Sequence, residues 1–431
     1  MTTADHHTHS PIALIERAVQ DRAKTVSLDL DGDNAEHALR SLIDDEINRW
    51  QNDFKRGLRP HQLVDTTQIA DRAFRNIARY GPLTALLDDD DVWEIMINSP
   101  SEIFCKRHSG PSGYHDETFE DDDHVIRTLT KILDDASTSH RKLDPNEGLQ
   151  DAQLDTGARL HIVHGDLARG GHIVVNIRKF TGMSYRSLDQ LVERDMLTND
   201  VARFLTACVH ARASIVFAGA PGSGKTTMLS CCAAELDPTL RVVMAEEVFE
   251  TDVPVANLAS LQTRPARVDR PAIDLRRLVS GFLRMAPDIA IVGEVRDREA
   301  LPLLLTLSSG VKGYTTIHAG SARQALTRLR FICQLADTSS ELPLSALNTL
   351  VSEAVDVVVH CERGPEGPRV TGIVAVEDLV AGADATQFTT TEVFTRRTLR
   401  DQIRPTGSVP SRLAALFERA GLSVTDEIGL S

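Results

Sequence analysis

The sequence predicts an α/β protein built from at least two domains, and three observations support that prediction. At 431 residues the chain is longer than one hydrophobic core usually organises, so two or three domains are expected. From about residue 191 onward, short apolar runs alternate with helical patterns, as in an open sheet covered by helices. One of these runs passes through a glycine-rich loop directly into a helix, an arrangement that binds phosphate groups.

Composition excludes several other classes of protein. Hydrophobic residues make up 42% of the chain and charged residues 25%, which is ordinary for a globular protein. No apolar run approaches the roughly 20 residues that cross a bilayer, and the N-terminus lacks the basic start and apolar stretch of a secretory signal. We therefore expect a cytoplasmic location, with any association with the inner membrane made through partners. The net charge of −15 repels phosphate backbones in general, so no nucleic acid is expected as a partner.

The cysteines and the polar segments near the N-terminus do not predict a metal site. None of the six cysteines belongs to a CxxC pair, so we expect small buried side chains. Residues 29–34 read DLDGDN, like the start of a calcium loop, but Asn34 and Arg40 replace the glycine and the glutamate that such a loop requires. The histidine tract at residues 6–9 is interpreted as part of a disordered tail.

Three regions follow one another along the chain. Residues 1–60 are polar and helical, and apolar residues recur every three to four positions between Leu39 and Phe54. Residues 61–190 have the mixed strands and helices of a smaller α+β domain. The expected strands of that domain lie at residues 92–98, 101–107, 158–164 and 172–180. Residues 191–431 form the α/β domain together with a C-terminal helical segment.

The α/β domain contains a phosphate-binding loop. A strand at 214–220 and a helix at 226–236 flank the sequence GAPGSGKT, which fits the pattern G-x-x-x-x-G-K-[ST]. The glycines let main-chain N–H groups approach the β-phosphate, Lys225 bridges the β- and γ-phosphates, and the Thr226 hydroxyl is a ligand for Mg²⁺. ATP and Mg²⁺ are therefore expected to bind here. The residues assigned to the nucleotide are Gly219, Ala220, Pro221, Gly222, Ser223, Gly224, Lys225, Thr226 and Thr227.

Two further strand patterns carry carboxylates at their ends. The strand at 287–295 ends in Glu294, at the sheet edge where ligands of open α/β sheets bind. Glu294 is the candidate to polarise the attacking water or to hold the metal through water, and an exposed acid is the alternative. The strand at 240–250 carries Glu246 and Glu247, only one of which can face the nucleotide because side chains alternate along a strand. Two exposed charges are the alternative for that pair.

A histidine and an arginine-rich segment complete the set of candidates. His318 ends a strand beside small residues, and a catalytic and a structural role both remain open for it. Arg264 and Arg276 belong to a cluster of arginines within one short stretch. Such a cluster in an acidic protein indicates an anion site, whereas a solvated loop paired with nearby carboxylates is the alternative.

Together these segments resemble the type II/IV secretion ATPase superfamily, and within it the CpaF-type ATPases of tight-adherence pili. The resemblance extends from about residue 62 to 426. GAPGSGKTT resembles the Walker A loop, RVVMAEEVFE the Asp box, LRMAPDIAIVGEVR the Walker B segment and GYTTIHAGSARQALTRL the His box. GPLTALLDDDDVWEIMINSP and VVNIRKF resemble the entry to and exit from the family's N-terminal domain, and RPTGSVPSRLAALFERAGL resembles the C-terminal end of the branch.

The resemblance implies a RecA-like P-loop ATPase domain and a smaller N-terminal domain that closes over the nucleotide. It also implies roles for single residues in ATP hydrolysis. Glu294 is implied to be the catalytic carboxylate and Glu246 the acid near the metal and the attacking water. His318 is implied to sense the γ-phosphate and to couple hydrolysis to domain movement.

The same resemblance implies arginines that contact the phosphates. Arg178 is the candidate from the N-terminal domain, and Arg159 is a weaker one. Arg264 and Arg276 match positions at which the family's ATPase domain carries arginines near the site. The sequence departs from the family pattern in its Asp box (AEE) and His box (HAG), and Gly293 stands where many P-loop enzymes have a metal-binding Asp. These departures concern the coupling of hydrolysis to movement rather than ATP binding.

Members of the family form homo-hexameric rings on an inner-membrane platform protein, so the resemblance implies a motor that extrudes pilin or protein substrate. The alternative is a RecA-like motor that translocates nucleic acid, which the acidic net charge and the His box oppose. A third interpretation is an adaptor that binds ATP without steady turnover. Pilus assembly, pilus retraction and protein export all remain open.

Overall fold

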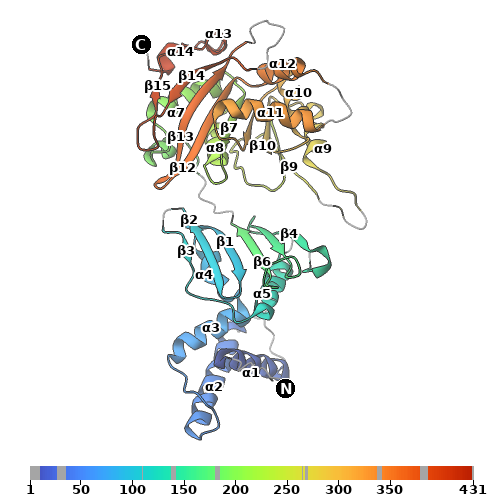
Figure 1. Ribbon diagram of the computed structural model, residues 1–431, viewed down its shortest axis with the longest axis vertical. Coiled ribbons are helices and arrows are strands. Elements are labelled where there is room, and N and C mark those ends of the chain that lie inside the picture. Colours follow the sequence, from blue (N-terminus) through green and yellow to red (C-terminus); the bar gives the residue numbers. More distant parts are fainter. Residues whose placement is uncertain are drawn as a thin grey trace. The chain divides into compact units, whose positions relative to one another are not determined.

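The computed structural model describes residues 10–26, 35–108, 110–136, 142–179, 185–264, 266, 270–336, 342–378 and 387–429. The chain divides into two compact units, Met1–Gly182 and Met183–Ser431, coloured blue to green and green to red in Figure 1. The histidine tract at residues 6–9 and the segment 29–34 lie outside the described residues.

The division between the units differs from the boundary that the sequence analysis placed after residue 190. That position lies within helix α6 (Leu188–Glu193), which begins after Ser187, a capping residue that accepts a hydrogen bond from the Gln190 N–H group. Leu188 and Leu191 of α6 are buried in the core of the second unit. The first turn of that unit therefore precedes the predicted boundary.

Three helices begin the first unit: α1 (Pro11–Val26), α2 (Ala35–Lys55) and α3 (Thr66–Ala78). The amphipathic helix expected between Leu39 and Phe54 is confirmed as α2. One small core holds the three helices together, with Ile15 and Val19 of α1, Leu39, Ile43, Ile47 and Trp50 of α2, and Ala73 and Phe74 of α3. The sequence analysis assigned α3 to the following domain, but its apolar face completes the core of the helices before it.

A six-stranded antiparallel sheet forms the rest of the first unit. Its strand order is β3-β2-β1-β6-β5-β4. The bounds are β1 Val92–Ser99, β2 Glu102–Arg107, β3 Gly113–Tyr114, β4 Leu149–Gln153, β5 Arg159–Val163 and β6 Val174–Arg178. Helix α5 (Asp122–Asp135) shares a core with alternate residues of the strands, including Ile95, Leu160 and Ile177. Short helices α4 (Leu83–Asp88) and η1 (Pro145–Glu147) complete this part.

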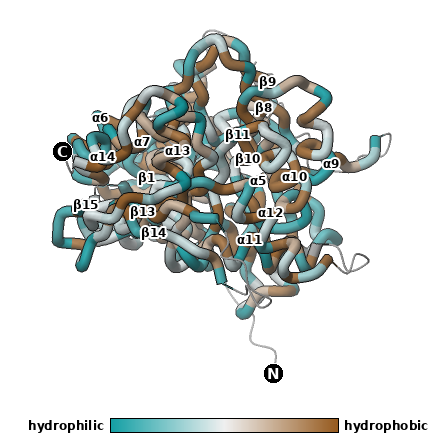
Figure 2. Tube along the Cα trace, turned by 90° about the horizontal axis from the view of Figure 1, so that it is seen from above, coloured by the Kyte–Doolittle hydropathy of each residue, from teal (hydrophilic) through white to brown (hydrophobic). Residues whose placement is uncertain are grey.

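The second unit is built on a nine-stranded sheet in the order β15-β14-β13-β12-β7-β11-β10-β8-β9. The six strands from β12 to β9 run parallel, and β13, β14 and β15 extend the sheet antiparallel beyond β12. The bounds are β7 Ile215–Gly219, β8 Val242–Glu246, β9 Leu258–Gln262, β10 Ile289–Val295, β11 Lys312–Ile317, β12 Val357–Gly364, β13 Gly367–Val376, β14 Thr390–Thr395 and β15 Arg404–Pro405. Figure 2 shows hydrophobic residues, in brown, along β8 and β10.

Helices cover both faces of this sheet, because the central strands are apolar on both sides. One face packs against α6, α7 (Asn199–His210), α8 (Lys225–Ala234), α13 (Ser411–Arg419) and α14 (Val424–Glu427). The other packs against α9 (Leu275–Val279), η2 (Phe282–Met285), α10 (Ala300–Ser308), α11 (Ala322–Ala336) and α12 (Leu344–Ala354). The predicted α/β class is thereby confirmed.

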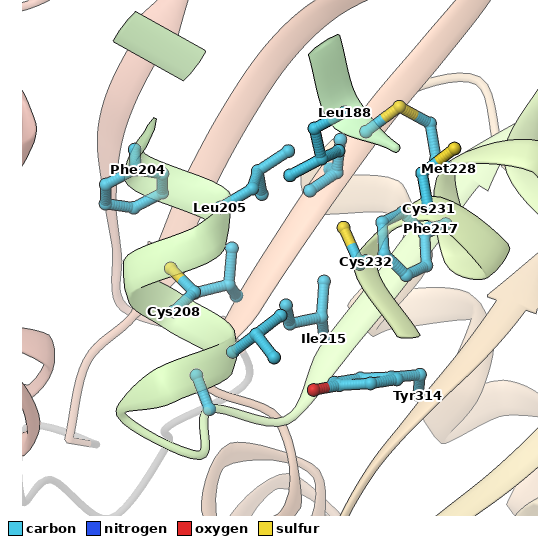
Figure 3. Packing of buried hydrophobic residues seen from close by; sticks show 14 of the residues in the cluster. Leu188, Phe204, Leu205, Cys208, Ile215, Phe217, Met228, Cys231, Cys232 and Tyr314 are labelled. Carbon is cyan, nitrogen blue, oxygen red and sulfur yellow. The ribbon is translucent and has the colours of Figure 1, made fainter. Parts of the chain in front are cut away.

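Figure 3 shows how the first of these faces is filled. Residues of α7 and α8, among them Leu205 and Cys232, gather over Phe217 of β7 and Tyr314 of β11. All six cysteines are buried thiols, as expected. Burial raises the pKa of Cys231 to about 12, so this thiol stays protonated and unreactive. In the described part of the chain, no helix is both long enough and apolar enough to cross a membrane.

The buried phenylalanines of the second unit allow a test of its packing. Phe204 of α7 is 0% exposed, and its ring lies 5.3 Å from that of Phe394 and 6.1 Å from that of Phe417. Phe204→Ala should lower the free energy of unfolding by about 3–5 kcal/mol, because it leaves a cavity that the neighbouring rings cannot fill. Phe331 on α11, which is 55% exposed, is the matched control. Phe331→Ala should change the free energy of unfolding by about 0.5 kcal/mol or less. Urea denaturation would measure both, and equal losses would contradict the packing described.

Candidate active site

Parallel pairing brings the four predicted motifs to one edge of the sheet. Strand β10 pairs in parallel with β8 and β11, and β11 pairs in parallel with β7. The carboxyl ends of these strands therefore lie side by side, and ligands of open α/β sheets bind at this edge. Each end carries one candidate: the glycine-rich loop after β7, Glu246 on β8, Glu294 on β10 and His318 after β11.

The loop between β7 and α8 can exist only with glycine at two of its positions. Gly219 and Gly224 have φ angles of 152° and 89°, in a region that side chains disfavour. A Cβ atom at Gly219 would lie 2.2 Å from the carbonyl oxygen of Cys361, and one at Gly224 would lie 2.7 Å from the Cε atom of Met196. The main chain of β12 thus leaves no room for a side chain at Gly219, and the positive φ of Gly224 disfavours one there.

Lys225 and His318 lie next to each other beneath this loop. The Lys225 side chain is buried, and its Nζ atom lies 2.9 Å from the carbonyl oxygen of Ala220 and 3.2 Å from Nδ1 of His318. Nε2 of His318 lies 2.7 Å from Oε1 of Glu294. Nδ1 of His318 also lies 3.2 Å from the carbonyl oxygen of Gly219, so the imidazole contacts the loop as well as Lys225 and Glu294. The histidine therefore links Lys225 in the loop to the acid on β10.

Glu294 is held on its other side by an arginine. Nη2 of Arg296 lies 2.5 Å from Oε2 of Glu294, and Nη1 lies 3.2 Å from Oε2 of Glu247. Burial alone would raise the pKa of Glu294, but hydrogen bonds from His318 and Arg296 outweigh it and lower the pKa to about 2. Glu294 is therefore ionised at neutral pH, with Arg296 at one oxygen and His318 at the other.

The pKa of Glu246 is shifted in the opposite direction from that of Glu294. Glu246 is only 3% exposed, and burial raises its pKa to about 7, although hydrogen bonds from Thr251 and from the Glu250 N–H group oppose the shift. Its Oε1 atom accepts from the Thr251 hydroxyl at 2.6 Å. Glu247, the residue after β8, is exposed, so the buried acid at the end of the strand is followed directly by an acid that faces away from the site.

Gly293 leaves the space that the Glu246 side chain occupies. A Cβ atom at Gly293 would lie 2.8 Å from Cγ and 2.9 Å from Oε1 of Glu246. An aspartate at position 293 is therefore incompatible with the observed position of Glu246. This explains, in terms of space, why glycine stands where many P-loop enzymes have a metal-binding aspartate.

The loop fits a phosphate group and one Mg²⁺ ligand. The Ser223 hydroxyl is fully buried in the loop and has no hydrogen-bond partner among the described residues, so it can donate to a phosphate oxygen. Thr226 follows Lys225 in the first turn of α8, where its hydroxyl could bind Mg²⁺ together with phosphate oxygens and water. Both oxygens of Glu294 already contact His318 and Arg296. Glu294 therefore fits a contact to the metal through water better than direct ligation.

The predicted arginines do not join this network. Arg264 donates to the carbonyl oxygen of Pro271 at 3.1 Å, within its own hairpin, and Arg276 is exposed on α9. Arg178 belongs to the first unit, where it pairs across the sheet with Glu94 on one side and Arg159 on the other. Directly opposed residues point to the same face of a sheet, so Arg178 and Arg159 lie next to each other on the face away from α5.

The sequence analysis missed two arginines that contact the site, Arg296 and Arg363. Arg296 stands two residues after Glu294 and one residue beyond β10, so its nearness in sequence to the candidate acid was a signal for a contact between them. That signal was available in the sequence. Arg363 lies at the end of β12, and its Nη1 atom is 3.2 Å from the carbonyl oxygen of Gly222 in the loop. These two residues are 141 positions apart, and no local pattern connects them.

Fold and site together define an α/β P-loop protein with a separate N-terminal unit. Residues 77–403 match the family model described as "Type II/IV secretion system protein", and the chain belongs to this family. The match spans both units and every motif at the sheet edge. The segment RPTGSVPSRLAALFERAGL lies beyond the matched residues, and the other motifs on which the predicted resemblance rests lie within them.

Two relatives in sequence agree with the family assignment. A probable conjugal transfer protein TrbB of Sinorhizobium fredii is 30% identical over 318 residues, covering 70% of this chain and 88% of its own. The type IV secretion system protein PtlH of Bordetella pertussis is 30% identical over 303 residues, covering 64% of this chain and 87% of its own. Among solved structures, the VirB11 ATPase of the Brucella suis type IV secretion system is 25% identical, with a TM-score of 0.36 over 68% of this chain and 91% of its own.

The raised pKa of Glu246 predicts a pH-dependent stability. The folded-state pKa of about 7 exceeds the ordinary value of 4.5, so the unfolded chain loses this proton first as the pH rises. The free energy of unfolding therefore falls between about pH 4.5 and pH 7. Glutamine keeps the acceptor for Thr251 but cannot ionise, so Glu246→Gln should be more stable than the wild type by about 1–3 kcal/mol at pH 7.5 and nearly equal to it at pH 4.5.

Thermal or urea unfolding across this pH range would measure the difference. Glu247→Gln is the matched control, because Glu247 is exposed and its loss should give no such pH-dependent gain. A Glu246→Gln variant that tracks the wild type at every pH would show that this carboxyl titrates normally.

Proposed function

We propose that this chain is an ATP-hydrolysing motor of a secretion or pilus-assembly machine. The observation that carries the proposal is the continuous contact from Lys225 in the phosphate-binding loop through His318 to Glu294. It joins a residue type that binds the β- and γ-phosphates to an acid that can act on the attacking water. Family membership supports the same activity.

In this proposal the loop residues 219–227 hold the phosphates of ATP, with main-chain N–H groups and Lys225 supplying the positive charge. When bound, Mg²⁺ would neutralise the charge of the β- and γ-phosphates, with the Thr226 hydroxyl among its ligands. The ammonium of Lys225 now donates to Ala220 and lies against His318. A γ-phosphate offers it a stronger, anionic acceptor.

Glu294 is proposed as the acid that orients and polarises the water. A carboxylate with a pKa of about 2 is a weak proton acceptor while His318 and Arg296 both bind it. Drawing His318 toward the phosphates would remove one of these partners and make Glu294 more basic. His318 would therefore act as the sensor that makes the acid competent only when a γ-phosphate is present.

Glu246 is proposed to act beside this acid, near the water and the metal. Its pKa of about 7 is close to the pH at which a group can both take up and release a proton. Hydrogen bonding with Thr251 and the close approach of Gly293 hold the Glu246 side chain in place at the end of β8. We assign the chemical step to Glu294 because Glu294 is in contact with the lysine–histidine pair.

Arginines from beyond the sheet edge are proposed to complete the phosphate site. Arg178 and Arg159 lie next to each other on one face of the N-terminal sheet, which supports a role in binding anionic groups. Arg264 and Arg276 lie outside the network formed by Lys225, His318 and Glu294 in their own unit. An arginine that does not reach its own site can serve the site of a neighbouring subunit in a ring.

The machine itself is proposed from the relatives. TrbB is named for conjugal transfer, and PtlH for type IV secretion. We infer a homo-hexamer in the cytoplasm that works against a membrane platform protein and moves pilin or protein substrate. The tight-adherence branch remains our prediction from the motifs between residues 62 and 426. ATP turnover stimulated by DNA would instead favour the nucleic-acid motor.

Substituting the proposed acid should separate binding from chemistry. Glu294→Gln keeps the size of the side chain but not its charge, so ATP should still bind while single-turnover hydrolysis slows by about 100-fold or more. Lys225→Ala removes the cation at the phosphates and should lose both binding and hydrolysis. Quench-flow with radiolabelled ATP and a nucleotide-binding assay would distinguish the two. Wild-type turnover in Lys225→Ala would exclude this loop as the ATPase site.

Mixed subunits should reveal whether an arginine acts across subunits. Lys225→Ala and Arg276→Ala chains, each inactive alone, should regain partial ATPase activity when mixed if Arg276 serves a neighbouring site. An arginine of this kind contributes roughly 10³–10⁵ in rate, so recovery would be easy to detect. The Lys225→Ala chain mixed with Glu294→Gln is the control, since both changes disable the same site. No recovery at any ratio, or full activity in a verified monomer, would contradict a shared site.

A further inference from the structure

The hairpin formed by β12 and β13 lies against the phosphate-binding loop. In the sheet, Cys361 of β12 pairs directly with Gly219 at the end of β7. The Pro368 side chain on β13 approaches Gly224 so closely that a Cβ atom there would lie 3.1 Å away. Arg363, near the end of β12, donates to the carbonyl oxygen of Gly222 at 3.2 Å. The hairpin thus contacts the beginning, the middle and the end of the loop.

The contact with Gly222 fixes the direction of one peptide group. In a trans peptide the C=O and N–H groups point in opposite directions. With its carbonyl turned toward Arg363, the Gly222–Ser223 peptide directs the Ser223 N–H group to the other side. There the N–H group donates to the carbonyl oxygen of Ala220 at 3.3 Å, and Nζ of Lys225 donates to the same atom at 2.9 Å. The Ser223 N–H group therefore lies on the side of the loop that holds the catalytic lysine.

Because residue 222 is a glycine, the orientation of the Gly222–Ser223 peptide depends on the contact with Arg363. Gly222 has a φ angle of 71° and no side chain, so its own backbone preferences restrict the adjoining peptide little. A guanidinium group donating to the carbonyl supplies a charge-assisted hydrogen bond, the stronger kind of restraint. Arg363 is half-buried and comes from a strand that is part of the central sheet, so the restraint is anchored in the core of the unit.

We propose that Arg363 is a positioning residue for nucleotide binding: it holds the Gly222–Ser223 peptide with its N–H group on the side of the loop where Lys225 lies, so that this group can exchange the Ala220 carbonyl oxygen for a phosphate oxygen when nucleotide binds. This inference rests on the proposed function, because it assigns the loop to ATP. Arg363 touches the outer side of the loop and acts through the peptide. Its contribution is made equally to bound ATP and to the transition state, since the same N–H group faces the phosphates in both. Loss of Arg363 therefore raises KM and leaves kcat nearly unchanged.

The test uses the full chain and a fluorescent N-methylanthraniloyl derivative of ADP as the probe. Arg363→Met keeps an unbranched side chain but removes the donor, and it should weaken ADP binding and raise KM for ATP by about 10-fold, with kcat within about twofold of the wild type. Arg363→Lys restores a cationic donor and should recover part of the affinity. Arg396→Met is the matched control, because Arg396 also donates to a main-chain carbonyl, that of Leu399 at 3.2 Å, away from the loop.

The outcomes separate this inference from the proposed function. Unchanged ADP affinity in Arg363→Met, with Lys225→Ala inactive, would overturn the role of Arg363 and leave the ATPase assignment intact. A fall in kcat with unchanged KM would also overturn it. Equal losses of affinity in Arg363→Met and Arg396→Met, accompanied by lower unfolding temperatures, would reduce the arginine to a structural role. A wild-type chain without ATP turnover would refute the proposed function itself.

Discussion

Parallel pairing of β8, β10, β11 and β7 is the constraint on which the site depends. Strands that run in the same direction end at the same edge, so residues far apart in the sequence meet there without any direct link between them. The strands are buried on both faces, and helices on each side hold them in register. The hydrophobic pattern of each strand determines where that strand lies in the sheet, and so where the site residue at its end is placed. The chemistry at the edge therefore needs few residues, because the core supplies the geometry.

The two acids at this edge differ because their neighbours differ. Glu294 contacts a histidine and an arginine, which favour its ionised form. Glu246 is buried beside hydroxyl and main-chain N–H groups, which compensate its burial only in part. Carboxylates with well-separated pKa values can serve different steps of one reaction. The fold thus gives two identical side chains distinct protonation states at neutral pH.

Sequence reasoning was most effective where a signal is local. The strand, loop and helix around residues 214–236 form a continuous pattern, and the structure has the corresponding elements β7 and α8. Glu246 is buried at the end of β8 and Glu247, the next residue, is exposed, in line with the expectation that the two acids cannot both face one site. Arg363 and β9 gave no such signal, because contact with Gly222 and pairing with β8 arise only from the tertiary fold. Arg178 lies in the first unit, and Arg264 and Arg276 lie outside the network of Lys225, His318 and Glu294, so the expectation that they contact the phosphates stays a prediction.

The close contact between Gly293 and Glu246 has a consequence for how this site can change over time. With Glu246 in its observed position, the end of β10 has no space for a side chain at position 293. The two positions are therefore coupled, and their substitutions will not act additively. A lineage that moves the acid from one strand to the other must shorten residue 246 before it enlarges residue 293. The reverse order passes through a strained intermediate, so sequence drift at this edge has a preferred direction.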